Sequence, residues 1–90
     1  MSLEPLEIAL KINGESYEIH RNDILVENTI GIYGEHEGIP IIGFRPTTNI
    51  EIGDILTNSM SQKFRVFKIF NEHWNGKIHQ RIAYVNLLWL

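Results

Sequence analysis

Residues 63–70, KFRVFKIF, constrain the fold of this chain most, because their apolar side chains occupy both faces of an extended strand. In a regular strand, Phe64, Val66 and Phe70 point to one face, and Phe67 and Ile69 point to the other. A polar loop separates this segment from a turn at Gly53-Asp54 and a short strand at residues 55–57. A strand with two apolar faces has to be covered on both sides, which is typical of small twisted sheets and barrels.

The amino-terminal part of the chain predicts a β-hairpin. Between residues 6 and 12, leucine and isoleucine occupy every second position. Asn13-Gly14 favours a two-residue type I′ turn, since both central positions of that turn require positive φ. Such a turn pairs residues 6–12 with residues 15–19 and gathers their apolar side chains on one face.

The middle of the chain predicts a second hairpin, with strands at residues 29–34 and 39–44 around the loop 35–38. Both strands place β-branched residues between glycines. Pro40 cannot donate to a strand ladder, so its strand is expected at an edge or at a bulge. Gly31 and Gly43 permit the sharp bends of a small barrel. Residues 23–27 fit either a short strand or one helical turn, and residues 45–49 form a connector.

The last hairpin joins residues 63–71 to residues 77–85, and its register has two solutions. A five-residue loop at 72–76 sets Phe70 opposite Ile78 and separates the apolar face from the polar face. A tight turn at Asn75-Gly76 sets Phe70 opposite Arg81 and has the better turn chemistry. We favour the five-residue loop, because burial of one face fixes the register of a strand pair.

Together these segments predict one all-β domain over residues 1–90, a small barrel or curled antiparallel sheet of about six strands built from consecutive hairpins. No stretch of ten or more residues shows helical periodicity with caps. The apolar end of the chain, residues 87–90, is expected to pack on the domain or on another subunit, because such a run is costly in water.

The composition of the chain indicates the cellular compartment that we expect for it. The chain has no cysteine, no apolar run near the ~20 residues that span a bilayer, and no signal-peptide pattern, so we expect a cytoplasmic protein without membrane contact. Its net charge of −3 is uneven. Residues 1–45 carry eight acids and three bases, a net −5, and residues 46–90 carry three acids and five bases, a net +2. A local basic face is therefore compatible with an acidic chain.

The residues form no recognisable catalytic or metal-binding motif. The four histidines lack zinc-site spacing, and Glu35-His36-Glu37 is interpreted as a solvated hairpin tip. Asp54 follows Gly53, which predicts that its carboxylate accepts a backbone hydrogen bond in a turn. With no cysteine, nucleophile elbow or phosphate-binding loop, we expect no catalytic residue, metal or cofactor, and therefore no enzyme.

We predict a non-enzymatic protein-interaction or assembly module, which binds a protein partner or forms a homo-oligomer. An aromatic side chain at a loop tip, such as Trp74, would be a suitable anchor, because aromatic residues dominate interface energetics. The candidate interaction residues are Arg65, Phe67, Ile69, Trp74, His79, Arg81 and Trp89.

The alternative function is binding of single-stranded nucleic acid, in which basic side chains and aromatic platforms combine on a small barrel. If the last hairpin has the five-residue loop, four side chains suited to this role share an outward face: Arg65, Phe67, His79 and Arg81.

Two stretches of the chain resemble known proteins. Ile52-Gly53-Asp54-Ile55-Leu56, followed by a polar loop and Phe64-Arg65-Val66-Phe67-Lys68-Ile69, is similar to small phage head–tail joining and stopper proteins. Tyr33-Gly34-Glu35-His36-Glu37-Gly38, joined to Ile41-Ile42-Gly43-Phe44, resembles uncharacterised short proteins of Gram-positive bacteria and their prophages. The resemblance spans about residues 30–85 and implies a ring-forming structural role without catalysis.

Overall fold

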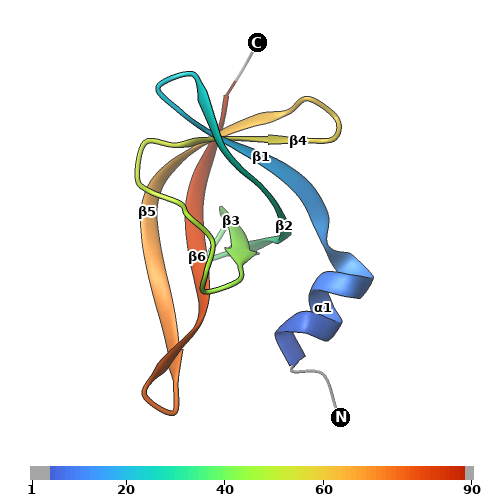
Figure 1. Cartoon of the computed structure of the whole chain (residues 1–90), viewed down its shortest axis with the longest axis vertical. Helices are drawn as coiled ribbons and strands as arrows, with labels where there is room; N and C mark the ends of the chain where they lie inside the picture. The colour runs from blue at the N-terminus through green and yellow to red at the C-terminus, as the bar shows by residue number, and fades with distance from the viewer. Residues whose placement is uncertain (1–4, 89–90) are drawn as a thin grey trace.

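A computed structural model describes residues 5–88 and shows a closed six-stranded antiparallel β-barrel preceded by one helix (Figure 1). The elements are α1 (Pro5–Asn13), β1 (Glu15–Arg21), β2 (Ile24–His36), β3 (Ile39–Phe44), β4 (Ile55–Asn58), β5 (Lys63–Trp74) and β6 (Lys77–Leu88). Around the barrel the strands follow the order β1-β2-β3-β6-β5-β4, and β4 closes the ring on β1. The predicted all-β barrel is confirmed.

The first expected strand is instead the helix α1, so the hairpin predicted for residues 6–19 is wrong. Leu6 and Leu10 are four residues apart and are both buried, whereas Ile8 is 44% and Ile12 is 74% exposed. The apolar residues therefore follow a helical stripe, although their spacing of two also suits a strand. Pro5 stands at the first helical position, where its missing N–H costs no hydrogen bond.

Asn13-Gly14 ends this helix and does not form a hairpin turn. The Gly14 N–H donates to the carbonyl oxygen of Leu10 at 2.9 Å, which closes the last helical turn. The first hairpin lies later in the chain, where Asn22 and Asp23 take φ of 53° and 66° between β1 and β2. Residues 15–19 are a strand as expected, but they pair with β2 and β4.

The second predicted hairpin is confirmed as β2 and β3. His36 pairs with Ile39 across a tight turn, in which Glu37 and Gly38 have φ of 53° and 80°. Pro40 pairs with Glu35 but lies outside the β3–β6 ladder, which begins at Ile41, so its missing donor is harmless. Residues 24–27 belong to β2. The segment 23–27, which fitted a short strand or one helical turn, is therefore a strand from residue 24 onward.

The barrel interior is filled by one apolar cluster drawn from β1, β3, β4, β5, β6 and the β3–β4 loop. It consists of Tyr17, Ile19, Ile42, Phe44, Ile50, Leu56, Phe64, Val66, Ala83 and Val85. Ile50, in the loop that joins β3 to β4, is 1% exposed, so this loop contributes to the core. The Tyr17 hydroxyl is buried and has no hydrogen-bond partner among the described residues.

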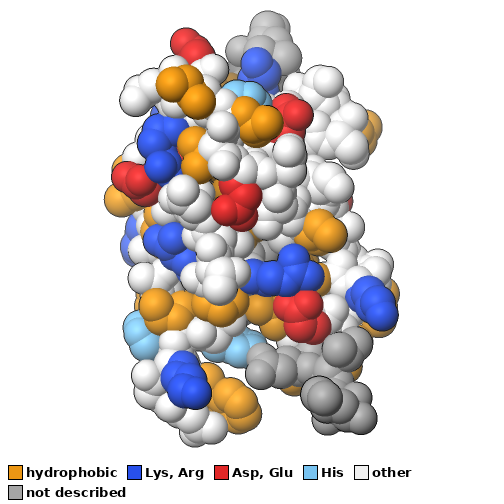
Figure 2. All heavy atoms as spheres, in the orientation of Figure 1, with side chains coloured by type: hydrophobic (Ala, Val, Ile, Leu, Met, Phe, Trp, Pro, Cys, Tyr) orange, Lys and Arg blue, Asp and Glu red, His pale blue; other side chains and the backbone are white. Residues whose placement is uncertain are grey.

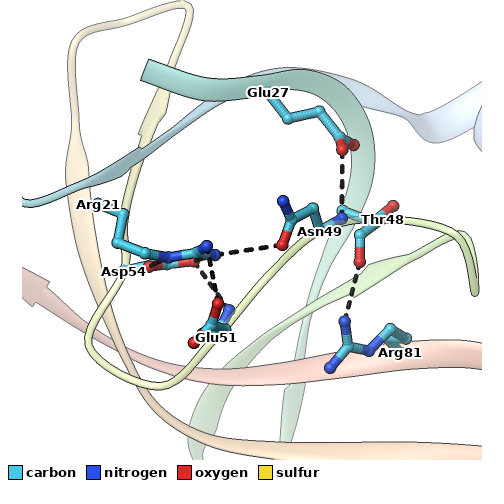
Figure 3. A network of polar contacts seen from close by, with 7 residues as sticks. All are labelled: Arg21, Glu27, Thr48, Asn49, Glu51, Asp54 and Arg81. Carbon is cyan, nitrogen blue, oxygen red and sulfur yellow. Dashed lines mark hydrogen bonds and ion pairs between the residues drawn. The ribbon is translucent and has the colours of Figure 1, made fainter. Parts of the chain in front are cut away.

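A polar network fixes the β3–β4 loop to the strands (Figure 3). Asp54 is 1% exposed and accepts two hydrogen bonds from Arg21, at 2.8 Å each, and one from the Glu51 N–H at 2.8 Å. The predicted backbone bond of Asp54 is confirmed, and the ion pair adds a partner from β1. Arg21 also contacts Glu51 at 2.7 Å, and the Asn49 N–H donates to Glu27 of β2 at 3.2 Å.

The β5–β6 hairpin has the tight turn, so the favoured five-residue loop is wrong. Asn75 and Gly76 take φ of 52° and 75°, and Trp74 pairs with Lys77 across them. Bulges at Phe67 in β5 and at His79 in β6 then shift the register by one and back again. These bulges allow the hairpin to keep the best turn and still separate its two faces, a combination that a regular ladder does not allow.

Candidate interaction surface

The bulge at Phe67 places two consecutive side chains of β5 on the outside of the barrel beside Tyr84 of β6. The ring centroids of Phe67 and Tyr84 are 6.3 Å apart, and the Lys68 ammonium lies 5.0 Å from the Tyr84 centroid. The Tyr84 hydroxyl is hydrogen-bonded to Nδ1 of His36, at the end of β2, at 3.1 Å. We call Phe67, Lys68, Tyr84 and His36 the Tyr84 cluster.

Further exposed apolar and basic side chains continue from the Tyr84 cluster along the hairpin. Phe67 is 40% and Phe70 is 50% exposed, Lys68 is exposed between them, and Arg65 is exposed two residues before Phe67. Figure 2 shows hydrophobic, Lys/Arg and Asp/Glu side chains mixed down the left of the molecule, on the side where Figure 1 places β5 and the β3–β4 loop. Such a mixture of aromatic rings and cations, half open to solvent, is typical of a binding surface.

A second exposed aromatic residue lies at the tip of the hairpin, next to a groove. Trp74 is 67% exposed, and its ring meets that of His79 edge to face with centroids 6.1 Å apart. The groove runs between this tip, α1 and the loop after β3, and its volume is about 530 Å³. Lys77 and Arg45 contribute positive charge to its wall.

The structure separates the candidate residues into different environments. Phe67 belongs to the Tyr84 cluster and Arg65 is exposed two residues before it, whereas Ile69 faces inward and packs against the core. Trp74 and His79 adjoin the groove. Trp89 lies outside the described residues.

Arg81 is held by the fold instead of being presented to a partner. Its Nε donates to Oδ1 of Asn71 at 3.0 Å, and its Nη1 donates to the Thr48 carbonyl oxygen at 2.9 Å (Figure 3). The expected common outward face of Arg65, Phe67, His79 and Arg81 does not form. The bulges shift the register between them, and this shift changes which side chains share a face.

Sequence reasoning missed Lys68, Tyr84 and His36 as parts of the surface. Val66 and Ile69 are both directed inward although they are three residues apart, an odd spacing that signals an extra residue in the strand. The run of apolar residues at 66, 67, 69 and 70 is the sequence signal that accompanies this bulge. The contact between His36 and Tyr84 has no local signal, because 48 positions separate the two residues.

One ion pair outside the barrel attaches α1 to the loop after β3. Arg45 donates to the two carboxylate oxygens of Glu7 from Nε at 2.8 Å and from Nη2 at 3.0 Å. These hydrogen bonds and the positive charge of Arg45 lower the pKa of Glu7, against a weaker opposing effect of desolvation. The pair holds the helix beside the groove.

A metal site and a membrane-spanning helix find no support in residues 5–88. No three histidine, aspartate or glutamate side chains gather there as metal ligands. None of the helices in this described part of the chain is long and apolar enough to cross a membrane. No protein-family model, curated protein or solved structure matches the chain. The exposed surface of β5 and β6 is the feature on which the functional proposal is built.

Proposed function

We propose that this protein is a non-enzymatic assembly module that binds a second copy of itself through the outer face of β5 and β6. The observation that supports this proposal is the pair of exposed aromatic rings, Phe67 and Phe70, next to Lys68. Burial of large aromatic side chains supplies much of the binding free energy at protein interfaces. No described segment of the same chain covers these rings fully.

Charge supports a second copy as the occupant of this face. The outer face of β5 carries Arg65 and Lys68, and residues 46–90 have a net charge of +2. Residues 1–45 have a net charge of −5 and supply an exposed set of acids that form no ion pair among the described residues: Glu15, Glu18, Asp23, Glu35 and Glu37. One copy therefore offers both halves of a complementary contact.

We propose that the contact between copies is head-to-tail, with the basic outer face of β5 of one copy against the acids of β1 and β2 of the next. A contact of this kind uses two different patches and generates a closed ring or an open filament. The resemblance of residues 52–69 to head–tail joining proteins supports a more specific version of the proposal, in which the module is a prophage-derived virion or connector component.

Light scattering coupled to size-exclusion chromatography tests the self-association. We expect the molar mass to rise with protein concentration and to fall at high salt, because screening weakens contacts between exposed charges. The double variant Phe67→Ser, Phe70→Ser should remain monomeric. Ile12→Ser is the matched control, because it removes an apolar side chain that is 74% exposed on α1, away from the proposed contact.

A charge-swap experiment tests the head-to-tail geometry. A variant with Arg65→Glu and Lys68→Glu loses its basic face, and a variant with Glu18→Lys and Asp23→Lys loses acids of β1 and of the β1–β2 turn. Each variant alone should be monomeric, and an equimolar mixture should associate, since each partner then supplies one intact face. A wild-type mass that stays monomeric at high micromolar concentration and low salt would overturn the self-assembly proposal.

Single-stranded nucleic acid is the second candidate partner, and the Tyr84 cluster favours it. Phe67 and Tyr84 provide rings for stacking, and Lys68 and Arg65 provide charge for phosphates. Labelled oligonucleotides at low and high salt discriminate the two functions. A protein that stays monomeric but binds oligonucleotides at low salt, and loses them at high salt, supports this alternative.

A further inference from the structure

The groove beside the hairpin tip combines an aromatic platform with an apolar floor. The β5–β6 tip extends past the barrel on the same end as α1 (Figure 1). Leu6, Pro46 and Ile78 line the groove, and Trp74 adjoins them with 67% of its surface exposed. An indole ring this exposed, in a concave site, can accept a flat ring against its face.

The charge of the groove selects for an anion. Lys77 pairs across the turn with Trp74, so its ammonium is tethered to the same tip as the indole. Arg45 uses Nε and Nη2 to bind Glu7, which leaves its Nη1 outside that ion pair. The residues that line the groove thus include two basic side chains, Lys77 and Arg45, and one carboxylate, Glu7. His79 adds a ring nitrogen that can donate or accept a hydrogen bond.

We infer that this groove binds a nucleoside monophosphate, either free or as one unit of a single strand. The base stacks on Trp74, and the phosphate lies between Lys77 and the free edge of Arg45. The volume of about 530 Å³ falls within the range of ~300–1,000 Å³ that is usual for small-molecule sites. The inference is independent of the self-assembly proposal, because the groove does not include Phe67, Lys68 or Phe70.

Titration with AMP, followed by the indole and amide signals in two-dimensional NMR, tests this inference. We expect saturable shifts of the Trp74 indole N–H and of the amides of Lys77 and His79, with a Kd on the order of 1 mM for one stacked base and one anion. Trp74→Ala should weaken binding about tenfold, whereas Trp74→Phe should keep part of the affinity. Lys77→Glu should also weaken binding of AMP. Lys63→Glu, at the other end of β5, is the control, because it changes the net charge by the same amount away from the groove.

Adenosine and inorganic phosphate separate the two components of recognition. Each should shift a subset of the same signals and bind more weakly than AMP. A trinucleotide that binds more tightly than AMP would identify the ligand as a single strand. The inference is overturned if AMP produces no saturable shift, if Trp74→Ala binds AMP as well as the wild type, or if phosphate alone reproduces the full effect. Spectra of each variant without ligand establish that it is folded.

Discussion

The tight packing around Gly31 predicts a sharp difference between two glycines of β2, Gly31 and Gly34. A methyl group at Gly31 would lie 2.6 Å from Cε1 of Phe44 and 2.8 Å from Cγ2 of Ile42. Ordinary carbon–carbon contacts are about 3.5–4.0 Å, so the added carbon overlaps two fully buried side chains. At Gly34, three residues further along the strand, the nearest atom would be Cγ1 of Ile41 at 3.9 Å, which is a normal contact.

The expected cost of Gly31→Ala follows from these distances. Overpacking of a core costs about 1–3 kcal/mol, and two simultaneous overlaps place this substitution near the upper end. Alanine also restricts the unfolded chain, which stabilises the protein by about 0.4–1 kcal/mol at a compatible position. We therefore expect Gly31→Ala to lower the free energy of unfolding by about 2 kcal/mol, and Gly34→Ala to leave it unchanged or to raise it slightly.

Urea denaturation followed by circular dichroism measures both variants, and the melting temperature of Gly31→Ala should fall by roughly 8–16 °C for a domain of this size. Phe44→Leu in the Gly31→Ala background should restore part of the loss, since it removes the nearest clashing atom. If Gly31→Ala and Gly34→Ala differ by less than about 0.5 kcal/mol, the packing argument is refuted.

Substitutions at three further positions test the polar groups. Asp54→Ala should lower the free energy of unfolding by about 2–3 kcal/mol, and Asp54→Asn by less, because the amide still accepts the Glu51 N–H; equal losses in urea denaturation would contradict this. The lowered pKa of Glu7 means that its contribution to stability is present above the ordinary carboxyl pKa of about 4.3 and is lost as the pH falls through the lower folded value. Glu7→Gln should abolish that acid dependence in melting curves recorded against pH. Burial raises the pKa of Tyr17, so the wild type should lose stability above about pH 10, where the unfolded tyrosine ionises first. Tyr17→Phe should remove this alkaline loss and stay within about 1 kcal/mol of the wild type at neutral pH, since the hydroxyl has no described partner.

The hairpins of this fold could be predicted wherever two local signals agreed. In β2 and β3, β-branched residues between glycines and a loop ending in Gly38 all favoured the same hairpin. Residues 6–12 were ambiguous, because leucines at positions 6 and 10 satisfy a helix and a strand equally well. Asn13-Gly14 did not resolve the ambiguity, since glycine also ends helices.

The candidate surface was less predictable, because it depends on contacts between distant residues and on local irregularities. Asp54 was expected to bond its own turn, and it does, but its partner Arg21 lies 33 positions away. Phe67 was identified as a candidate while Lys68 and Tyr84 were not, because regular alternation places Lys68 on the inner face. A bulge interrupts that alternation. The bulge lets Ile69 pack against the core, and this tertiary contact stabilises the irregular strand.

The bulge at Phe67 also determines where the chain tolerates a change in length. Loss of one residue within a regular strand exchanges the inner and outer faces for every residue beyond it. Loss of Phe67 would instead join Val66 directly to Lys68, and the side chains on both sides would keep their present directions, because Phe67 is the unpaired extra residue. His79 has the same property in β6. The hairpin can therefore lose a residue at either of these two positions while the barrel keeps its core, and at Phe67 such a loss alters mainly the surface that is available to a partner.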